Sequence, residues 1–376
     1  MKSEYRPLKS LVRRKIGYGI VQPGKDNVGE VHLIKVNNII SGLKNIEDLD
    51  RTTSEIEKKY ERTRLKGGEL VISVVGTPGR TAIVPKSFAG CNLVRAVALI
   101  DIVDCLTSWV KYYIDSPNGQ NYILQNLNTT VQPTLNIKDL SEMPILIMDR
   151  KKMESIVSIL SAIDRKIEFN NRINENLELQ AQAIFKSWFV DFEPFGGVMP
   201  VDWNVGAFSD VADVLSGKRP PMKQNDKTED ASIPLIGAAA IMGYTNKFNH
   251  DDKILVIGRV GTHGIVQRFD YPCWTSDNTL VIKSNYYEYT YQILKLIDYK
   301  AMNRGSTQPL ITQGDLKKTE IIIPSKECLQ KYENIVGSLM YQYSQNRTEN
   351  EKLALLRDTL LPKLMNGEID VSKVRI

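Results

Sequence analysis

Apolar residues recur at alternating steps of four and three through residues 149–189. This spacing puts them on one face of an α-helix, and a pattern sustained over several heptads predicts a partner helix along that face. Residues 325–365 repeat the pattern, with Tyr332 in the place of Ile156. The first apolar face, here called a seam, consists of Ile156, Leu160, Ile163, Ile167, Leu177, Ala181, Ile184 and Trp188. The second seam consists of Tyr332, Val336, Leu339, Tyr343, Leu353, Arg357, Leu360 and Leu364.

Both stretches have the ends that helices require. Asp149 and Ser325 are N-cap residue types at equivalent positions. Helix-breaking residues follow each stretch, namely Pro194, Gly196 and Gly197 after the first and Asn366 and Gly367 after the second. Each predicted helix has about 40 residues and is roughly 60 Å long. Because this length exceeds that of an ordinary packed helix, we predict a coiled-coil spacer.

Polar residues interrupt both seams at the same places. Asn170 and Asn174 in the first seam correspond to Asn346 and Asn350 in the second. If the helices pair antiparallel about a pseudo-twofold axis, the midpoint of the first helix lies next to Asn170, which then faces Asn346. We expect this central polar layer to fix the register at a cost in stability. The alternative is two unrelated long surface helices.

A mixed domain is predicted before each long helix. Residues 1–148 contain β-type runs at 31–36, 69–75, 81–84, 94–103 and 143–148, and a helical stretch at 105–126. Residues 199–324 contain β-type runs at 253–260, 265–268, 279–283 and 320–323, and a helical stretch at 289–302. The predicted fold is α+β, with two mixed α/β domains in tandem repeat, separated by two long antiparallel coiled-coil helices. The spacers are assigned to 149–193 and 325–367, and a C-terminal tail to 368–376.

Short segments inside the two domains also match. Val75–Gly79 corresponds to Val260–Gly264, and Thr129–Pro133 corresponds to Gly305–Pro309. The helices keep strict register between the halves, whereas the earlier loops differ in length and residue type. A duplicated frame with divergent loops suits the reading of two different targets at a fixed separation.

Composition narrows the function classes only slightly. The 376 residues allow two or three domains, and a hydrophobic content of 42% with 25% charged residues is that of a globular protein. A net charge of +5 permits a polyanionic partner. The sequence has no signal-peptide core and no apolar run that would cross a bilayer, so we expect a cytoplasmic protein without a membrane partner. The four cysteines lack any CxxC motif and are expected to be buried thiols.

Signatures of catalysis are missing from the sequence. It has neither the Asp/Asn-Pro-Pro-Tyr/Phe tetrad of amino-methylation nor a Gly-x4-Gly-Lys-Ser/Thr nucleotide loop. His32, His250 and His263 lack metal-ligand spacing. We therefore predict no catalytic residue, no metal site and no cofactor in this chain.

Several motifs in fixed order carry a family resemblance. They are Gln132-Pro133, Gln308-Pro309, Met199-Pro200-Val201-Asp202-Trp203, Leu215-Ser216-Gly217, Ile184-Phe185-Lys186-Ser187-Trp188-Phe189 and Leu360-Leu361-Pro362-Lys363-Leu364-Met365-Asn366-Gly367. As a duplicated set covering nearly the full length, they resemble the specificity (S) subunit of type I restriction-modification systems. The segment Tyr5–Gly24 departs from the family, since it lacks a Pro-x-x-Trp opening.

The resemblance implies a non-catalytic subunit with two target-recognition domains, each reading one half of a split sequence in double-stranded DNA. Such subunits bind two methyltransferase (M) subunits, which use S-adenosylmethionine, and restriction (R) subunits, which use ATP and magnesium. Half-sites read from one face of B-DNA lie about 34 Å apart, a separation that a rod of roughly 60 Å can span. Self-association of the isolated chain stays open.

Reading bases in the major groove requires polar side chains on exposed turns, chiefly Arg for guanine and Asn or Gln for adenine. The candidates in the first domain are Lys35, Asn37, Asn38, Thr77 and Arg80. Those in the second domain are Lys218, Arg219, Arg259, His263 and Arg304. The alternative for each of them is an ordinary solvated surface residue.

An aromatic cluster at the end of the first long helix is the candidate site for the M subunits. It consists of Trp188, Phe189 and Phe192, since aromatic residues often anchor interfaces, and the exposed seam of the helices would extend it. The alternative is that these residues pack on the second domain. Two other functions stay open: the specificity chain of a combined nuclease-methyltransferase, and a coiled-coil scaffold that binds no DNA.

Overall fold

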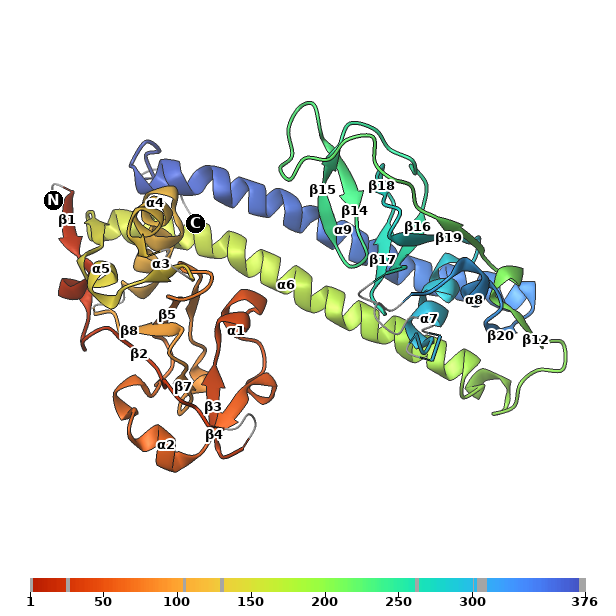
Figure 1. Cartoon of the computed structure of the whole chain (residues 1–376), viewed down its shortest axis with the longest axis horizontal. Helices are drawn as coiled ribbons and strands as arrows, with labels where there is room; N and C mark the ends of the chain where they lie inside the picture. The colour runs from red at the N-terminus through yellow and green to blue at the C-terminus, as the bar shows by residue number, and fades with distance from the viewer. Residues whose placement is uncertain are drawn as a thin grey trace. The chain divides into compact units, whose positions relative to one another are not determined.

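The computed structural model describes residues 3–24, 28–103, 106–128, 132–260, 264–299, 301–302 and 310–371. Its contacts divide the chain into two compact units. Unit 1 comprises Met1–Glu168 and Glu349–Ile376, and unit 2 comprises Phe169–Thr348. Both long helices are present as predicted, α6 at Arg150–Phe189 and α9 at Lys326–Met365 (Figure 1). Each unit therefore contains one mixed domain and part of both long helices.

The helix ends follow from local sequence. The side chain of Asp149 accepts a hydrogen bond of 3.0 Å from the backbone N–H of Lys151, as an N-cap residue does. The backbone carbonyl of Ser325 accepts one of 3.0 Å from the N–H of Leu329. At the end of α9, Gly367 has a φ of +74°. Glycine takes this left-handed conformation without strain, which is why the helix stops there.

The described residues of unit 1 form two sheets and two strand pairs. The four-stranded antiparallel sheet has the order β2 (Gly17–Tyr18), β8 (Val97–Ile100), β5 (Leu70–Ser73), β6 (Thr81–Ile83). The three-stranded sheet has the order β4 (Asp50–Thr52), β3 (Val31–Ile34), β7 (Asn92–Leu93), with β3 and β7 parallel. The pairs are β1 (Glu4–Pro7) with β11 (Pro144–Ile147), and β9 (Leu127–Asn128) with β10 (Thr134–Leu135). The helices are α1 (Val36–Ser41), α2 (Ser54–Lys58), α3 (Thr107–Asp115), α4 (Pro117–Gln125) and α5 (Ile137–Glu142).

Unit 2 repeats this strand topology. Its four-stranded sheet has the order β13 (Asp213–Ser216), β19 (Thr279–Lys283), β16 (Ile254–Gly258), β17 (Val266–Phe269). Its three-stranded sheet has the order β15 (Ile241–Thr245), β14 (Ile233–Ile236), β18 (Trp274–Thr275), with β14 and β18 parallel. The strands β12 (Asn204–Ala207) and β20 (Glu320–Ile323) pair, and the helices are α7 (Tyr287–Leu296) and α8 (Gln313–Lys317). The two domains share one sheet plan, so the predicted tandem repeat is confirmed.

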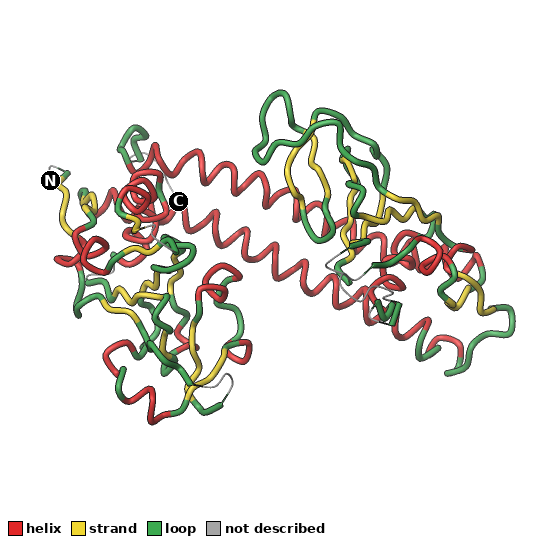
Figure 2. Tube along the Cα trace, in the orientation of Figure 1, coloured by secondary structure: helices red, strands yellow, loops and turns green. Residues whose placement is uncertain are grey.

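Three predicted elements differ from the structure. The single helix expected at 105–126 is two helices, because Ser116 caps the start of α4 and Pro117 follows it without an N–H to donate. The helix expected at 289–302 ends at Leu296. The β-type run at 31–36 ends at Ile34, since α1 already begins at Val36. Strands and loops make up most of both domains, whereas α6 and α9 are helical throughout (Figure 2).

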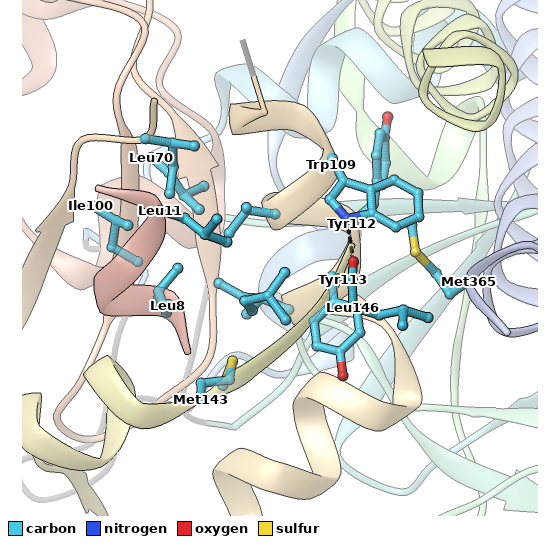
Figure 3. Packing of buried hydrophobic residues seen from close by; sticks show 14 of the residues in the cluster. Leu8, Leu11, Leu70, Ile100, Trp109, Tyr112, Tyr113, Met143, Leu146 and Met365 are labelled. Atoms are coloured by element: carbon cyan, nitrogen blue, oxygen red, sulfur yellow. Dashed lines mark hydrogen bonds between the residues drawn. The ribbon is translucent and has the colours of Figure 1, made fainter. Parts of the chain in front are cut away.

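Each domain shares a hydrophobic core with the long helices. In unit 1, Ile156 and Leu160 of α6 and Leu364 of α9 pack into the domain core. Trp109 of α3 lies in this core and donates a hydrogen bond of 2.8 Å from its indole N–H to the carbonyl of Leu146 (Figure 3). The core of unit 2 includes Ala181 and Phe185 of α6 and Tyr332, Val336 and Met340 of α9. The two seams therefore hold the recognition domains as well as the partner helix.

Candidate nucleic-acid interface

The loop between β5 and β6 has a fixed backbone. The hydroxyl of Ser73 donates 2.5 Å to the carbonyl of Thr77 and accepts 2.9 Å from the N–H of Arg80. The side-chain amide of Gln120 donates 3.2 Å to the carbonyl of Gly79. The side chains of Thr77 and Arg80 are exposed. The loop therefore presents a hydroxyl and a guanidinium from a rigid support, which is what base reading requires.

The candidates on α1 lie close to this loop. Ile39 and Ile40 of α1 and Thr77 and Arg80 line one groove of about 670 Å³ in unit 1. The neighbouring Asn37 is exposed. The structure therefore places α1, the helix that carries Asn37, beside the predicted β5–β6 loop.

Two of the α1 candidates already have partners inside the domain. Lys35 forms an ion pair with Asp50. The side-chain carbonyl of Asn38 accepts 2.7 Å from the backbone N–H of Lys35 and so helps to fix the start of the helix. Both residues support the domain structure in this conformation.

The described candidates of unit 2 occupy the equivalent end of the second sheet. Ser216 of β13 pairs with Leu280, and Gly258 of β16 pairs with Thr279, so both strands end opposite the start of β19. Lys218 and Arg219 follow β13 with exposed side chains, and the half-buried Arg259 follows β16. In unit 1, β5 likewise ends opposite the start of β8. The predicted loops of the two domains therefore leave equivalent sheets at the same end.

The backbone of this second surface is also fixed. The N–H of Lys218 donates 2.9 Å to the carbonyl of Thr275, and the indole N–H of Trp274 donates 2.8 Å to the carbonyl of Lys218. Arg259 is held by a bond of 2.8 Å from its N–H to the carbonyl of Asn278. The candidates His263 and Arg304, and the motif segments 129–131, 261–263 and 305–309, lie outside the described residues.

Sequence reasoning missed an exposed apolar and basic group beside β15. Met242 and Phe248 are 39% and 51% exposed. Gly243 of β15 has a φ of +145°, which favours glycine. The side chain of Lys223 passes close to this glycine, since its Cε atom lies 3.4 Å from the position that a Cβ atom would occupy. The segment around Gln224 therefore runs along β15 and brings Lys223 to it. No periodic pattern identifies this group, because Lys223 and Phe248 come from irregular chain outside β15.

Of the aromatic residues proposed as a partner site, Phe189 belongs to the core of unit 2 and the half-buried Trp188 and Phe192 pack against that core, which corrects the first interpretation. Phe189 is 3% exposed. Its ring centroid lies 4.9 Å from that of Tyr289 and 5.0 Å from that of Tyr332. Trp188 packs edge-on against Tyr332, and Phe192 against Trp203. The contacts match the alternative, in which these residues pack on the second domain.

The polar layer of the helix pair is shifted from the predicted one. Asn346 donates its hydrogen bond of 2.9 Å to Asn174, one helical turn beyond the expected Asn170. Each helical side chain points toward the N-terminus of its own helix. In an antiparallel pair, two side chains that meet therefore belong to residues that lie C-terminal, on each helix, to the two backbone positions that face each other. Asn170 is itself buried, with 1% exposure, and Asn350 is half-buried.

The described residues contain no group of three or more His, Cys, Asp or Glu side chains arranged to hold a metal ion. None of the helices in the described ranges is both long and apolar enough to cross a membrane. The three described cysteines, Cys91, Cys273 and Cys328, are buried free thiols. Burial raises the pKa of the Cys91 thiol to about 11 and that of Cys273 to about 12, so both are poor nucleophiles.

A repeated domain with polar loops at the same end of each sheet, joined by paired helices, defines a two-domain recognition protein. The family model of the type I restriction modification DNA specificity domain matches residues 2–179 and 200–356. The chain belongs to this family. Its role is recognition of a DNA target, and it is a non-catalytic component.

Named relatives agree with this assignment, and a solved structure has a similar fold. The chain is 26% identical over 311 residues to the type I restriction enzyme MjaIX specificity subunit of Methanocaldococcus jannaschii, an alignment that covers 72% of this chain and 71% of that protein. It is 26% identical over 328 residues to the HindI specificity subunit of Haemophilus influenzae, covering 63% and 71%. A crystal structure of the type I S subunit from M. genitalium has a similar fold, with a TM-score of 0.60 at 17% identity over 97% of this chain and 96% of that one.

Proposed function

We propose that each recognition domain reads one half of a split DNA sequence and that α6 and α9 set the gap between the halves. The observation that carries this proposal is the shared sheet topology with different loops at equivalent strand ends. A shared frame gives both domains the same way of approaching DNA. Different loop side chains give them different bases to read. The domains are assigned to 1–148 and 199–324, with the spacers at 149–193 and 325–367.

In the first domain, Arg80, Thr77 and Asn37 are the proposed base readers, since their side chains are exposed and the groove that Thr77 and Arg80 line is also lined by α1, the helix that carries Asn37. In the second, Lys218 and Arg219 after β13 and Arg259 after β16 take this role. Arg is suited to guanine and Asn to adenine, whereas Lys contacts phosphate or guanine. Binding is expected to weaken steeply with salt, because phosphate contacts release counterions.

We also propose that the chain works with two methyltransferase subunits and with restriction subunits, all in the cytoplasm with the DNA. Two copies of one partner need two similar surfaces. Leu179 of α6 and Leu355 of α9 occupy equivalent repeat positions and are 61% and 70% exposed. This pair replaces the aromatic cluster as the proposed methyltransferase surface. S-adenosylmethionine, ATP and magnesium would be bound by the partners.

The test is a map of methylated adenines across the host genome with and without this gene. The proposal expects one split motif to lose methylation when the gene is deleted. Exchange of residues 199–324 for those of a relative should then change one half-motif and leave the other. If no split motif depends on the gene, the proposal fails and a scaffold without DNA binding is favoured. Co-purifying subunits distinguish a type I complex from a combined nuclease-methyltransferase.

A further inference from the structure

Each recognition domain donates one tyrosine hydroxyl to a carboxylate on α6. In unit 1, Tyr112 of α3 donates 2.7 Å to Asp164. In unit 2, Tyr291 of α7 donates 2.8 Å to Glu178. The two tyrosines come from equivalent helices of the repeat, yet both carboxylates lie on the same long helix. These two hydrogen bonds are here called the tyrosine ties.

Both ties are charge-assisted, and they join a buried tyrosine to a half-buried carboxylate. Tyr112 and Tyr291 are 5% and 6% exposed. Asp164 also pairs with Arg357 of α9 at 3.0 Å, and Glu178 pairs with Lys295 of α7 at 2.8 Å. Burial and the neighbouring carboxylate raise the pKa of both tyrosine hydroxyls, so each stays protonated and able to donate. Hydrogen bonds to charged groups are stronger than neutral ones, which favours one fixed geometry.

In unit 1, α3 is also bonded to the strand that follows the proposed reading loop. Thr81 at the start of β6 donates 2.6 Å to Asp115 at the end of α3. Lys111 of α3 holds the other oxygen of Asp115 at 2.8 Å. Thr81 is the residue next to Arg80. The hydrogen bond from Thr81 therefore links the loop to α3, and the hydrogen bond from Tyr112 to Asp164 links α3 to α6.

In unit 2, different residues make the same connection. Arg268 of β17 donates two hydrogen bonds, of 2.7 and 2.6 Å, to Glu288 of α7. The guanidinium of Arg268 also lies 4.5 Å from the ring centroid of Tyr291. The strand β17 is the equivalent of β6 in the sheet order, and it is the strand that follows the candidate Arg259. Both domains thus connect the strand after the loop to a helix, and that helix to α6 through a tyrosine.

We propose that Tyr112 and Tyr291 are positioning residues for target recognition. Each orients the reading loop of its own domain relative to α6, through its hydrogen bond to a carboxylate of that helix. The proposal rests on the proposed function, in which each domain reads one half-site. Neither hydroxyl touches DNA in this proposal. Loss of one tie should therefore impair discrimination at one half-site and leave the other half-site unaffected.

The test compares Tyr112→Phe with Tyr291→Phe in the full chain assembled with its methyltransferase partners. Phenylalanine keeps the ring packing and removes the hydroxyl alone. Affinity is measured at one salt concentration for the intact target and for two targets, each with one half-site replaced. The preference for the intact target over each altered one measures discrimination at that half-site. The exchange of residues 199–324 assigns the half-sites to the domains.

We expect Tyr112→Phe to lower discrimination at the first half-site about three- to tenfold and to leave the second unchanged, less than the full loss of a charge-assisted hydrogen bond because the hydroxyl acts on the DNA only through the loop. Tyr291→Phe should do the reverse. Tyr122→Phe is the matched control, because its hydroxyl donates 2.9 Å to the carbonyl of Asp139 within the first domain and not to α6. It should leave both preferences unchanged.

Two results would overturn the proposal: neither tyrosine variant alters either preference, or each lowers both preferences equally. A control variant that behaves like Tyr112→Phe would also overturn it, because the effect would then be one of general stability. Failure of the proposed function looks different. In that case the unaltered complex itself shows no preference for either half-site, and both proposals fall.

Discussion

The side-chain amide of Asn346 donates a hydrogen bond of 2.9 Å to the side-chain carbonyl of Asn174 within the helix pair of unit 2. The two residues are 5% and 8% exposed. Asn174 in turn donates 3.2 Å to the backbone carbonyl of Tyr343, and Asn346 accepts 2.8 Å from Gln342. The pair therefore keeps its polar atoms bonded only when α6 and α9 have this register.

Replacing one member of this pair should destabilise the protein more than replacing both. Asn174→Leu leaves the buried amide of Asn346 without its acceptor, which costs about 1–3 kcal/mol. The double change Asn174→Leu with Asn346→Leu gives an apolar layer of similar volume and should be neutral or stabilising. Denaturant unfolding of Asn174→Leu, Asn346→Leu and the double variant measures the difference.

The same double variant should loosen the register of the helices, so the complex would accept more than one gap between half-motifs. Methylation mapping reads this directly. A double variant that is destabilised by the sum of its two single changes, and that still methylates one gap only, would show that Asn174 and Asn346 act independently and do not set the register.

The buried ion pair of Arg268 and Glu288 gives a second prediction. Their side chains are 15% and 5% exposed. Arg268→Met leaves the Glu288 carboxylate buried and unpaired, and we expect a loss of about 3–5 kcal/mol in the free energy of unfolding. Arg268→Met combined with Glu288→Leu should recover most of that loss, because no buried charge remains.

Arg51 provides the control for this prediction, since its pair with Glu47 has side-chain exposures of 41% and 75%. Arg51→Met should change the unfolding free energy by less than about 1 kcal/mol. Equal losses for Arg51→Met and Arg268→Met would contradict the assigned importance of burial.

The carboxyl group of Glu333 predicts a pH dependence of stability. Burial raises the pKa of Glu333 from 4.5 to about 7, although the carboxyl accepts hydrogen bonds from the N–H groups of Glu288 and Tyr289. The folded protein therefore holds this proton where the unfolded chain has released it. The contribution of the Glu333 carboxyl to the free energy of unfolding is fully present below pH 4.5 and is lost as the pH rises to about 7.

Glu333→Gln should remove that component, because the amide does not titrate and still offers an oxygen to one N–H group. Unfolding free energies of both proteins, measured from pH 4.5 to about 7.5, give the comparison. The wild-type protein should lose roughly 3 kcal/mol relative to Glu333→Gln over this range, because each tenfold change in proton affinity corresponds to about 1.4 kcal/mol. A wild-type protein whose stability rises relative to Glu333→Gln would contradict the raised pKa.

The long helices were predictable because their signals are local and repeated. The four-three spacing, the cap at Asp149 and the breaker Gly367 all lie in the sequence itself, and the structure has each of them. The break between α3 and α4 was also encoded, since Ser116 and Pro117 form a helix start. Apolar periodicity on both sides of that break concealed it.

The contacts across each unit were not predictable in the same way. Phe189 is of a residue type that often anchors interfaces, so the sequence favoured a partner site. Only the fold shows that Tyr289 and Tyr332 pack around it. Asn346 donates to Asn174, and not to the expected Asn170, because of the direction in which side chains point in the assembled helix pair. The placement of Thr77 and Arg80 beside α1 requires the fold of unit 1, because the β5–β6 loop and α1 lie far apart in the sequence.

The last prediction concerns the length of the spacer. Four residues of helix-forming sequence inserted after Arg172 and four more after Thr348, its repeat equivalent, lengthen α6 and α9 by one turn each. Because both helices grow equally, their antiparallel pairing on either side of the insertion is kept. One turn adds about 6 Å, and one base pair occupies about 3.4 Å, so the gap between half-motifs should grow by up to about two base pairs. Methylation mapping should find both half-motifs unchanged, since no recognition loop is altered.

Insertion after Arg172 alone is the matched control. It adds the same four residues to α6 but leaves α9 at its original length, so the two helices can no longer keep their pairing through the full spacer. We expect this variant to lose methylation of the split motif. If the double insertion changes the bases of either half-motif, or methylates the original gap, then the helices do not determine the spacing and that part of the proposed function is wrong.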